Sequence, residues 1–247
     1  MGTILGPDIL IRCKDAFDSE QKQLAKRIVP SATDVVYGLH ERHRLDIYQP
    51  QGAGPFPILV FVHGGGFLKG GKGDVEDWTN ANVGRMAAER GLLGVVINYR
   101  LAPDHGWPAG AEDVAATVDW LKANAASYDG DADKIMLMGT SAGAVHVSGY
   151  LKLRSQHNID IRGVILLSGL YGYTPLDDRD LLYYGESSLY AKRMPMEAVA
   201  STTLPLLVAC AEFDPPRFQA EFLGLMQDRL ARHGTMPRAY VASGHNH

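Results

Sequence analysis

The chain has 247 residues, 46% of them hydrophobic and 21% charged, which is typical of a globular protein that buries a sizeable core. Its formal net charge of -4 comes from 24 basic and 28 acidic residues that are well mixed, and no basic block could follow a phosphate backbone. Nucleic acid is therefore not an expected partner. No apolar run approaches the length of a membrane span, and residues 1–12 lack the pattern of a signal peptide, so we expect a cytoplasmic protein with no membrane partner.

Helical and strand-like patterns alternate along the chain. Residues 1–30 carry a helical pattern, and residues 34–37 and 43–48 are typical of two antiparallel edge strands joined by a hairpin. Further strands are expected at residues 58–63, 93–99, 134–138, 163–167, 204–209 and 239–241. Helices are expected at residues 77–90, 109–125, 142–155 and 216–233. This order predicts an α/β fold whose mostly parallel central sheet has about eight strands and is flanked by helices.

Two segments are candidates for a small lid, the N-terminal residues 1–30 and the loop-rich residues 169–203. Tyrosines in the second segment could line a pocket or simply pack within the lid: Tyr171, Tyr173, Tyr183, Tyr184 and Tyr190. No internal repeat or linker divides the chain, so we expect a single domain that spans residues 1–247.

The pentapeptide 139–143, Gly-Thr-Ser-Ala-Gly, lies between an expected strand and an expected helix. A nucleophile elbow requires this setting, because a sharp strand-to-helix turn with small flanking residues lifts the serine side chain above the edge of the sheet. A chance match in a glycine-rich chain is the alternative, but it would not explain why strand, turn and helix occur in order. The pattern therefore predicts that Ser141 is the nucleophile of a hydrolase.

Three successive glycines follow His63, directly after the expected strand 58–63. Backbone N–H groups in such a loop can stabilise the negative charge that develops on a carbonyl oxygen during acyl transfer. The alternative is a flexible or phosphate-binding turn, but no Gly-Lys-Ser/Thr follows. We therefore expect an oxyanion hole formed by Gly65 and Gly66 together with Ala142.

Three motifs together resemble the α/β-hydrolase superfamily, and more narrowly its hormone-sensitive-lipase-like esterases. They are His-Gly-Gly-Gly-Phe at 63–67, Asn-Tyr-Arg-Leu-Ala-Pro at 98–103 and the pentapeptide at 139–143. The motifs occur in the family's order and approximate spacing, and the similarity runs from about residue 34 to the end of the chain. The resemblance implies an α/β-hydrolase fold, and it implies that an acid and then a histidine follow the nucleophile in sequence.

The expected acid is Asp214, which follows the strand 204–209 and matches the family's Asp-Pro turn. A buried carboxylate at this place would orient the histidine and stabilise its cationic form. An aspartate before two prolines is also a good helix start, so an N-cap is the alternative role. Glu212 is the weaker candidate for the acid.

The candidates for the base are His245 and His247 near the end of the chain. The resemblance favours His247, because related esterases place the catalytic histidine three residues after a glycine, here Gly244, and carry an apolar residue at the earlier position. Solvent-facing loop histidines are the alternative for both. The family continues into a final helix, so we also expect that the natural protein is longer and that a C-terminal helix follows residue 247.

Several other polar residues are expected to support the site rather than act in it. In the resembled family the histidine before the glycines, here His63, orients the loop, and Arg100 with Asp113 would form a structural ion pair. No histidine has the spacing of a metal ligand, and Cys13 and Cys210 belong to no metal-spaced cluster, so we expect no metal and reduced thiols.

The residues and the resemblance together predict a serine carboxylesterase that cleaves short-chain or compact aromatic esters through an acyl-enzyme and needs no cofactor. An amidase or arylformamidase with the same groups is the first alternative. A binding protein that kept the fold but lost catalysis is the second. The expected partner is a small-molecule ester, and the resemblance also allows a homodimer through an edge strand or a terminal helix.

Overall fold

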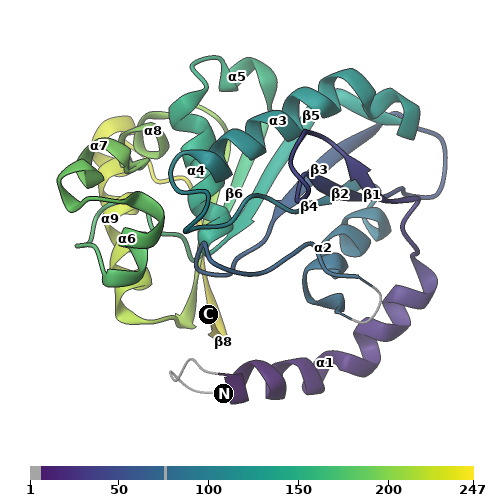
Figure 1. Cartoon of the computed structure of the whole chain (residues 1–247), viewed down its shortest axis with the longest axis horizontal. Coiled ribbons are helices and arrows are strands. Elements are labelled where there is room, and N and C mark those ends of the chain that lie inside the picture. The colour runs from purple at the N-terminus through teal and green to yellow at the C-terminus, as the bar shows by residue number, and fades with distance from the viewer. Residues whose placement is uncertain (1–6, 75–76) are drawn as a thin grey trace.

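The computed structural model describes residues 7–74 and 77–247 of the chain. Its centre is one sheet in the order β1-β2-β4-β3-β5-β6-β7-β8 (Figure 1). The strands are β1 (Ala32–Val36), β2 (Arg44–Tyr48), β3 (Phe56–Val62), β4 (Leu93–Ile97), β5 (Gly130–Thr140), β6 (Gly163–Leu167), β7 (Leu206–Phe213) and β8 (Arg238–Asn246). β2 is antiparallel to both β1 and β4, and the other neighbouring strands are parallel. The mostly parallel eight-stranded sheet expected from the sequence is confirmed.

Helices cover both faces of the sheet. They are α1 (Pro7–Arg27), α2 (Trp78–Glu89), α3 (Ala109–Asn124), η1 (Ala125–Tyr128), α4 (Ala142–Leu153), α5 (His157–Asp160), α6 (Asp178–Tyr184), η2 (Ser187–Leu189), α7 (Tyr190–Arg193), α8 (Met196–Ser201) and α9 (Pro216–His233). On one face α2 packs on β2, β3 and β4 and carries α1 on its outer side; on the other, α3 packs against α4, and α8 lies between α4 and α9 (Figure 1). Within residues 7–74 and 77–247, no helix combines the length and the apolar character needed to cross a membrane.

The central strands are apolar on both faces because both are buried. In β3, Val60 packs into the core under α3 and α4, whereas Phe61 packs into the smaller core under α2. In β4, Val95 packs into the core under α3 and α4, and Val96 packs into the core under α2. Alternation along a strand sends successive side chains to opposite faces, so each of these strands joins the two cores.

Three expectations about the elements were wrong. β2 is not an edge strand, because it pairs with β4 as well as with β1. Residues 169–203 are not mostly loop, because they contain α6, η2, α7 and α8. The last strand does not end at residue 241; β7 continues to Phe213 and pairs there with Asn246 of β8 beyond an irregularity in the register. His245 therefore lies in a strand.

The parallel strands bring the expected site residues to one edge of the sheet. The glycine loop follows β3, Ser141 follows β5, Asp214 follows β7 and His247 follows β8. Since the carboxyl ends of parallel strands meet at the same edge, residues far apart in sequence converge there.

Candidate active site

Ser141 occupies the turn between β5 and α4 with φ 53° and ψ -120°, a backbone conformation that a residue with a side chain rarely adopts. Two close approaches hold the turn. A β carbon on Gly143 would lie 2.0 Å from the carbonyl oxygen of Val62, and one on Gly139 would lie 2.4 Å from that of Gly143. Only glycine fits at either position, and this tight packing of α4 against the sheet leaves the Ser141 hydroxyl at the strand ends.

The Ser141 hydroxyl lies 2.9 Å from Nε2 of His247, and Nδ1 of the same ring lies 2.7 Å from Oδ1 of Asp214. An ionised Asp214 can only accept, so it assigns the proton to Nδ1 and leaves Nε2 to accept the hydroxyl proton of Ser141. The ring of Phe218 packs 4.2 Å from the imidazole, centroid to centroid. His245, by contrast, is exposed, and its Nδ1 lies 2.8 Å from the carbonyl oxygen of Ser243.

The carboxylate of Asp214 is only 2% exposed and is held from both sides. Its Oδ2 accepts hydrogen bonds from the hydroxyl of Ser168 at 2.6 Å and from the N–H of Ala211 at 2.8 Å. Burial alone would raise the pKa of Asp214, but the hydrogen bonds from His247, Ser168 and Ala211 outweigh burial and lower it. The group therefore stays ionised beside the imidazole at neutral pH.

Sequence reasoning did not single out Ser168, which follows β6 in a left-handed conformation with φ 46°. The signal that could have found it is its place at the carboxyl end of the strand between those that carry Ser141 and Asp214. Glu212, the weaker candidate for the acid, has a different place. It accepts hydrogen bonds from the Ser243 hydroxyl at 2.8 Å and the Gly244 N–H at 2.7 Å, and so anchors the turn that leads to His247.

The glycine loop lies against the serine. A β carbon on Gly64 would be 3.2 Å from the β carbon of Ser141, and the next two residues have positive φ angles, 131° at Gly65 and 60° at Gly66. Ala142 is the first residue of α4, where backbone N–H groups have no partner within the helix. The loop and the helix start therefore bring backbone donors to the same side of the sheet edge as the serine hydroxyl.

The chain is similar to several known proteins. The BD-FAE family model matches residues 45–166, which include the glycine loop and Ser141. A probable isoprenylcysteine α-carbonyl methylesterase of Oryza sativa subsp. japonica is 42% identical over 111 residues, which are 44% of this chain and 25% of that protein. The versiconal hemiacetal acetate esterase of Dothistroma septosporum is 31% identical over 172 residues, which are 66% of this chain and 51% of that protein.

A solved structure, the hyperthermophilic esterase from the archaeon Pyrobaculum calidifontis, superposes with a TM-score of 0.72 and 23% sequence identity over 96% of this chain and 82% of that one. The chain therefore has the α/β-hydrolase fold. The fold expected from the resemblance is thus confirmed. The chain spans about half, or less, of the length of the first curated relatives it matches.

Buried polar groups support the glycine loop. His63 is fully buried, and its Nδ1 donates to the carbonyl oxygen of Gly64 at 2.6 Å. Burial, only partly offset by that hydrogen bond, lowers the pKa of His63 to about 4, so the ring is neutral. Arg100 and Asp113 form the expected ion pair at 2.7 Å, and His43 adds a contact to Asp113 at 3.0 Å.

The segment expected as a lid packs on the residue that follows the glycines. The ring of Tyr183 in α6 stacks on Phe67 with centroids 4.4 Å apart and planes within 3°. Tyr171 and Tyr184 are also buried, so these three tyrosines pack within the fold rather than line an open pocket. The stacking of Tyr183 on Phe67 therefore joins α6 to the glycine loop.

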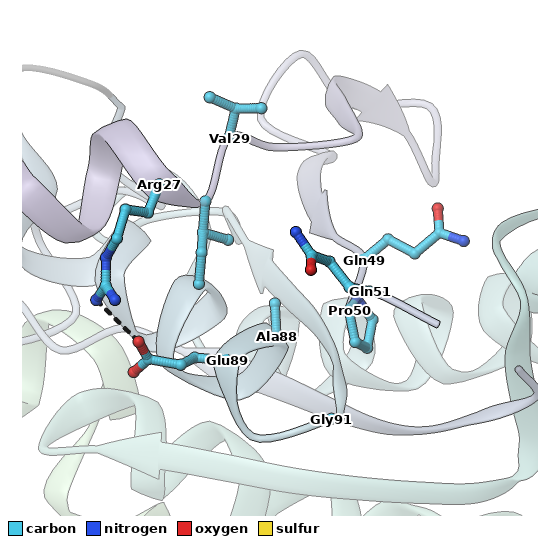
Figure 2. Close-up of a pocket in the computed structure, with 9 residues that line it drawn as sticks. Arg27, Val29, Gln49, Pro50, Gln51, Ala88, Glu89 and Gly91 are labelled. Carbon is cyan, nitrogen blue, oxygen red and sulfur yellow. Dashed lines mark hydrogen bonds and ion pairs between the residues drawn. The ribbon is translucent and has the colours of Figure 1, made fainter. Parts of the chain in front are cut away.

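Hollows also lie away from Ser141, His247 and Asp214. One, of about 540 Å³, is bordered by the ion pair of Arg27 and Glu89 and by Gly91 (Figure 2). Because Gly91 comes just before β4, this hollow lies at the edge of the sheet opposite Ser141. Another, of about 520 Å³, is apolar and lies between α1 and Trp78. Cys13, which lines it, has Sγ 3.9 Å from Oδ1 of Asn246, so α1 passes beside the chain end that carries His247.

In the part of the chain that the structure describes, no three His, Cys, Asp or Glu side chains gather in a group that could hold a metal ion.

Proposed function

We propose that the protein is a carboxylesterase that hydrolyses small esters through an acyl-enzyme on Ser141. The observation that carries the proposal is the continuous hydrogen-bonded chain from Ser141 through His247 to Asp214, with distances of 2.9 and 2.7 Å. A serine hydroxyl is a weak nucleophile unless a base accepts its proton, and Nε2 of His247 is placed to do so. The named relatives support the ester as substrate, because they are esterases themselves.

In the proposed reaction the Ser141 oxygen attacks the ester carbonyl carbon while His247 takes the hydroxyl proton. Asp214 stays ionised and stabilises the imidazolium that forms. The N–H groups of Gly65, Gly66 and Ala142 stabilise the negative charge on the carbonyl oxygen, where the loss of one donor costs about 3 kcal/mol in a well-studied hydrolase.

Collapse of the tetrahedral intermediate expels the alcohol, which takes the proton from His247. Water then attacks the acyl group on Ser141 with His247 again as base, and the acid leaves. Each proton that the serine and the water release thus returns to a leaving group, and no cofactor enters the cycle.

The test compares Ser141→Ala with Ser148→Ala on p-nitrophenyl esters from acetate to palmitate and on an aryl formamide. Ser148 is the matched control because it lies in α4, the helix that follows Ser141, and its hydroxyl donates to the Ala144 carbonyl at 2.7 Å within that helix. We expect the Ser141 variant to lose at least about a thousandfold in kcat/KM on short-chain esters and the Ser148 variant to keep most of it. Turnover of the formamide alone would point to an amidase, and an inert wild type would point to a binding protein.

We also propose a short-chain or compact aromatic ester as the substrate, a cytoplasmic location and a homodimer. The buried tyrosines support the compact substrate, because they pack with Phe67 and Ala142 beside the site and leave no open pocket among themselves. The chain-length series measures this directly, and we expect kcat/KM to fall from butyrate to palmitate.

A further inference from the structure

The guanidinium group of Arg179 lies over the glycine loop. A β carbon built on Gly66 would lie 3.3 Å from Cδ, 3.4 Å from Nη1 and 3.6 Å from Nε of Arg179. Gly66 is one of the proposed oxyanion donors, and Gly64 of the same loop lies against Ser141. Because two residues span at most about 7 Å, Arg179 and Ser141 lie against neighbouring parts of the same short loop.

The charge of Arg179 is available for a ligand. Two acidic residues near Arg179 in sequence, Asp177 and the buried Asp180, form ion pairs with Arg217 instead, the first at 2.8 Å. Within residues 7–74 and 77–247, Arg179 forms no ion pair, and it is exposed to solvent. The third acidic neighbour, Asp178, is also exposed and likewise forms no ion pair among these residues.

The helix that carries Arg179 is held firmly in place. The stacking of Tyr183 on Phe67 joins α6 to the residue directly after the glycine loop. The Asp177 side chain accepts from the Arg179 N–H at 3.1 Å and caps the start of α6. A guanidinium held beside the glycine loop is suited to binding a carboxylate, because its planar donors can form two parallel hydrogen bonds with it.

We propose that Arg179 selects esters that carry a carboxylate or a similar anionic group a few atoms from the scissile carbonyl. This inference rests on the proposed esterase function and specifies its substrate class. Arg179 would be a specificity residue that binds the substrate's anionic group, whereas the bond-breaking steps stay with Ser141 and His247. The anionic group could belong to the acyl part or to the alcohol part, and the test separates the two.

The experiment uses two substrate pairs in which a carboxylate is replaced by a methyl ketone of the same shape. Monoethyl succinate and ethyl levulinate carry the group on the acyl side; O-acetylglycolate and acetoxyacetone carry it on the alcohol side. The kcat/KM ratio of the anionic to the neutral ester is measured by pH-stat titration for wild type, Arg179→Gln and Arg179→Lys. Arg90→Gln is the matched control, because Arg90 is exposed at the far end of α2.

We expect Arg179→Gln to lower the ratio about tenfold for one of the two pairs, as the loss of a charge-assisted hydrogen bond at a partly solvated site would do. Arg179→Lys should lower it less, and Arg90→Gln should leave it unchanged. Because a ratio does not depend on the fraction of folded enzyme, partial misfolding of a variant cannot imitate this result. Added salt should also lower the wild-type ratio.

A ratio that changes less than twofold in Arg179→Gln for both pairs, with wild type active on the neutral esters, would overturn the inference and leave the esterase function standing. A wild type that hydrolyses none of the four esters would overturn the esterase function itself. The two failures are therefore distinguishable.

Discussion

The hydroxyl of Ser168 donates a 2.6 Å hydrogen bond to Oδ2 of Asp214, on the carboxylate oxygen that does not face His247. This contact helps to lower the pKa of Asp214 and fixes the plane of the carboxylate. Ser168 touches neither the proposed nucleophile nor the base in the contacts described, so its proposed role is to position the acid.

The first prediction is that Ser168→Ala lowers kcat roughly tenfold while KM changes little, because a misaligned acid weakens the transition state more than substrate binding. Ser201→Ala is the control, since the Ser201 hydroxyl donates to the Glu197 carbonyl at 2.7 Å, far from the site on α8. Steady-state kinetics on a short-chain ester checks it. An unchanged kcat in Ser168→Ala would show that the Ala211 N–H suffices to hold Asp214.

The second prediction concerns the close approach under the Ser141 turn. Gly143→Ala should destabilise the fold by more than about 3 kcal/mol, because the new methyl group would lie 2.0 Å from the Val62 carbonyl oxygen. Gly91→Ala is the matched control: it has a positive φ of 78° but no atom within 4 Å of the new group, so strain of about 1 kcal/mol is expected. Urea unfolding measures both, and equal losses would contradict the close packing.

The third prediction is a pH dependence of stability that comes from buried histidines. Burial lowers the pKa of His146 to about 3, so the fold keeps this ring neutral, whereas the unfolded chain takes up a proton below pH 6.5. The contribution of the neutral His146 ring to the free energy of unfolding is therefore complete above pH 6.5 and is lost as pH falls from there toward 3. The variant His146→Gln can still contact the Tyr183 hydroxyl. It should lack the part of the acid-induced loss of stability that comes from His146.

Unfolding free energies at pH 4.5, 5.5 and 6.5 would measure the effect. The free energy of unfolding should fall less steeply with decreasing pH in His146→Gln than in wild type. The difference in slope is expected to reach at most about 1.4 kcal/mol per pH unit, which corresponds to the uptake of one proton on unfolding. The same experiment on His157→Gln is the control, since His157 is partly exposed. Parallel curves for wild type and His146→Gln would show that this ring is not kept neutral by the fold.

The sequence predicted most of the sheet and the residues that meet at its edge, because each is marked by local chemistry. Glycines around Ser141 indicate a tight turn, three glycines after β3 indicate bare N–H groups, and Asp-Pro follows β7. The structure places His247 within hydrogen-bond distance of both Ser141 and Asp214.

What sequence alone did not predict depends on contacts between segments. Ser168 contacts Asp214 across the neighbouring strands β6 and β7, and Arg179 reaches Gly66 from α6, whose Tyr183 stacks on Phe67. The short helices of residues 169–203 were not predicted, because α-helices of four to seven residues leave little periodicity to detect.

The proposed role of His247 as the base for Ser141 is tested by the kcat/KM of His247→Gln and His245→Gln on p-nitrophenyl butyrate. The second histidine is the matched control, because it lies two residues away but is exposed and contacts Ser243. We expect His247→Gln to lose at least about a thousandfold and His245→Gln to stay within about threefold of wild type. Equal activity in the two variants, or a greater loss in His245→Gln, would show that His247 is not the base.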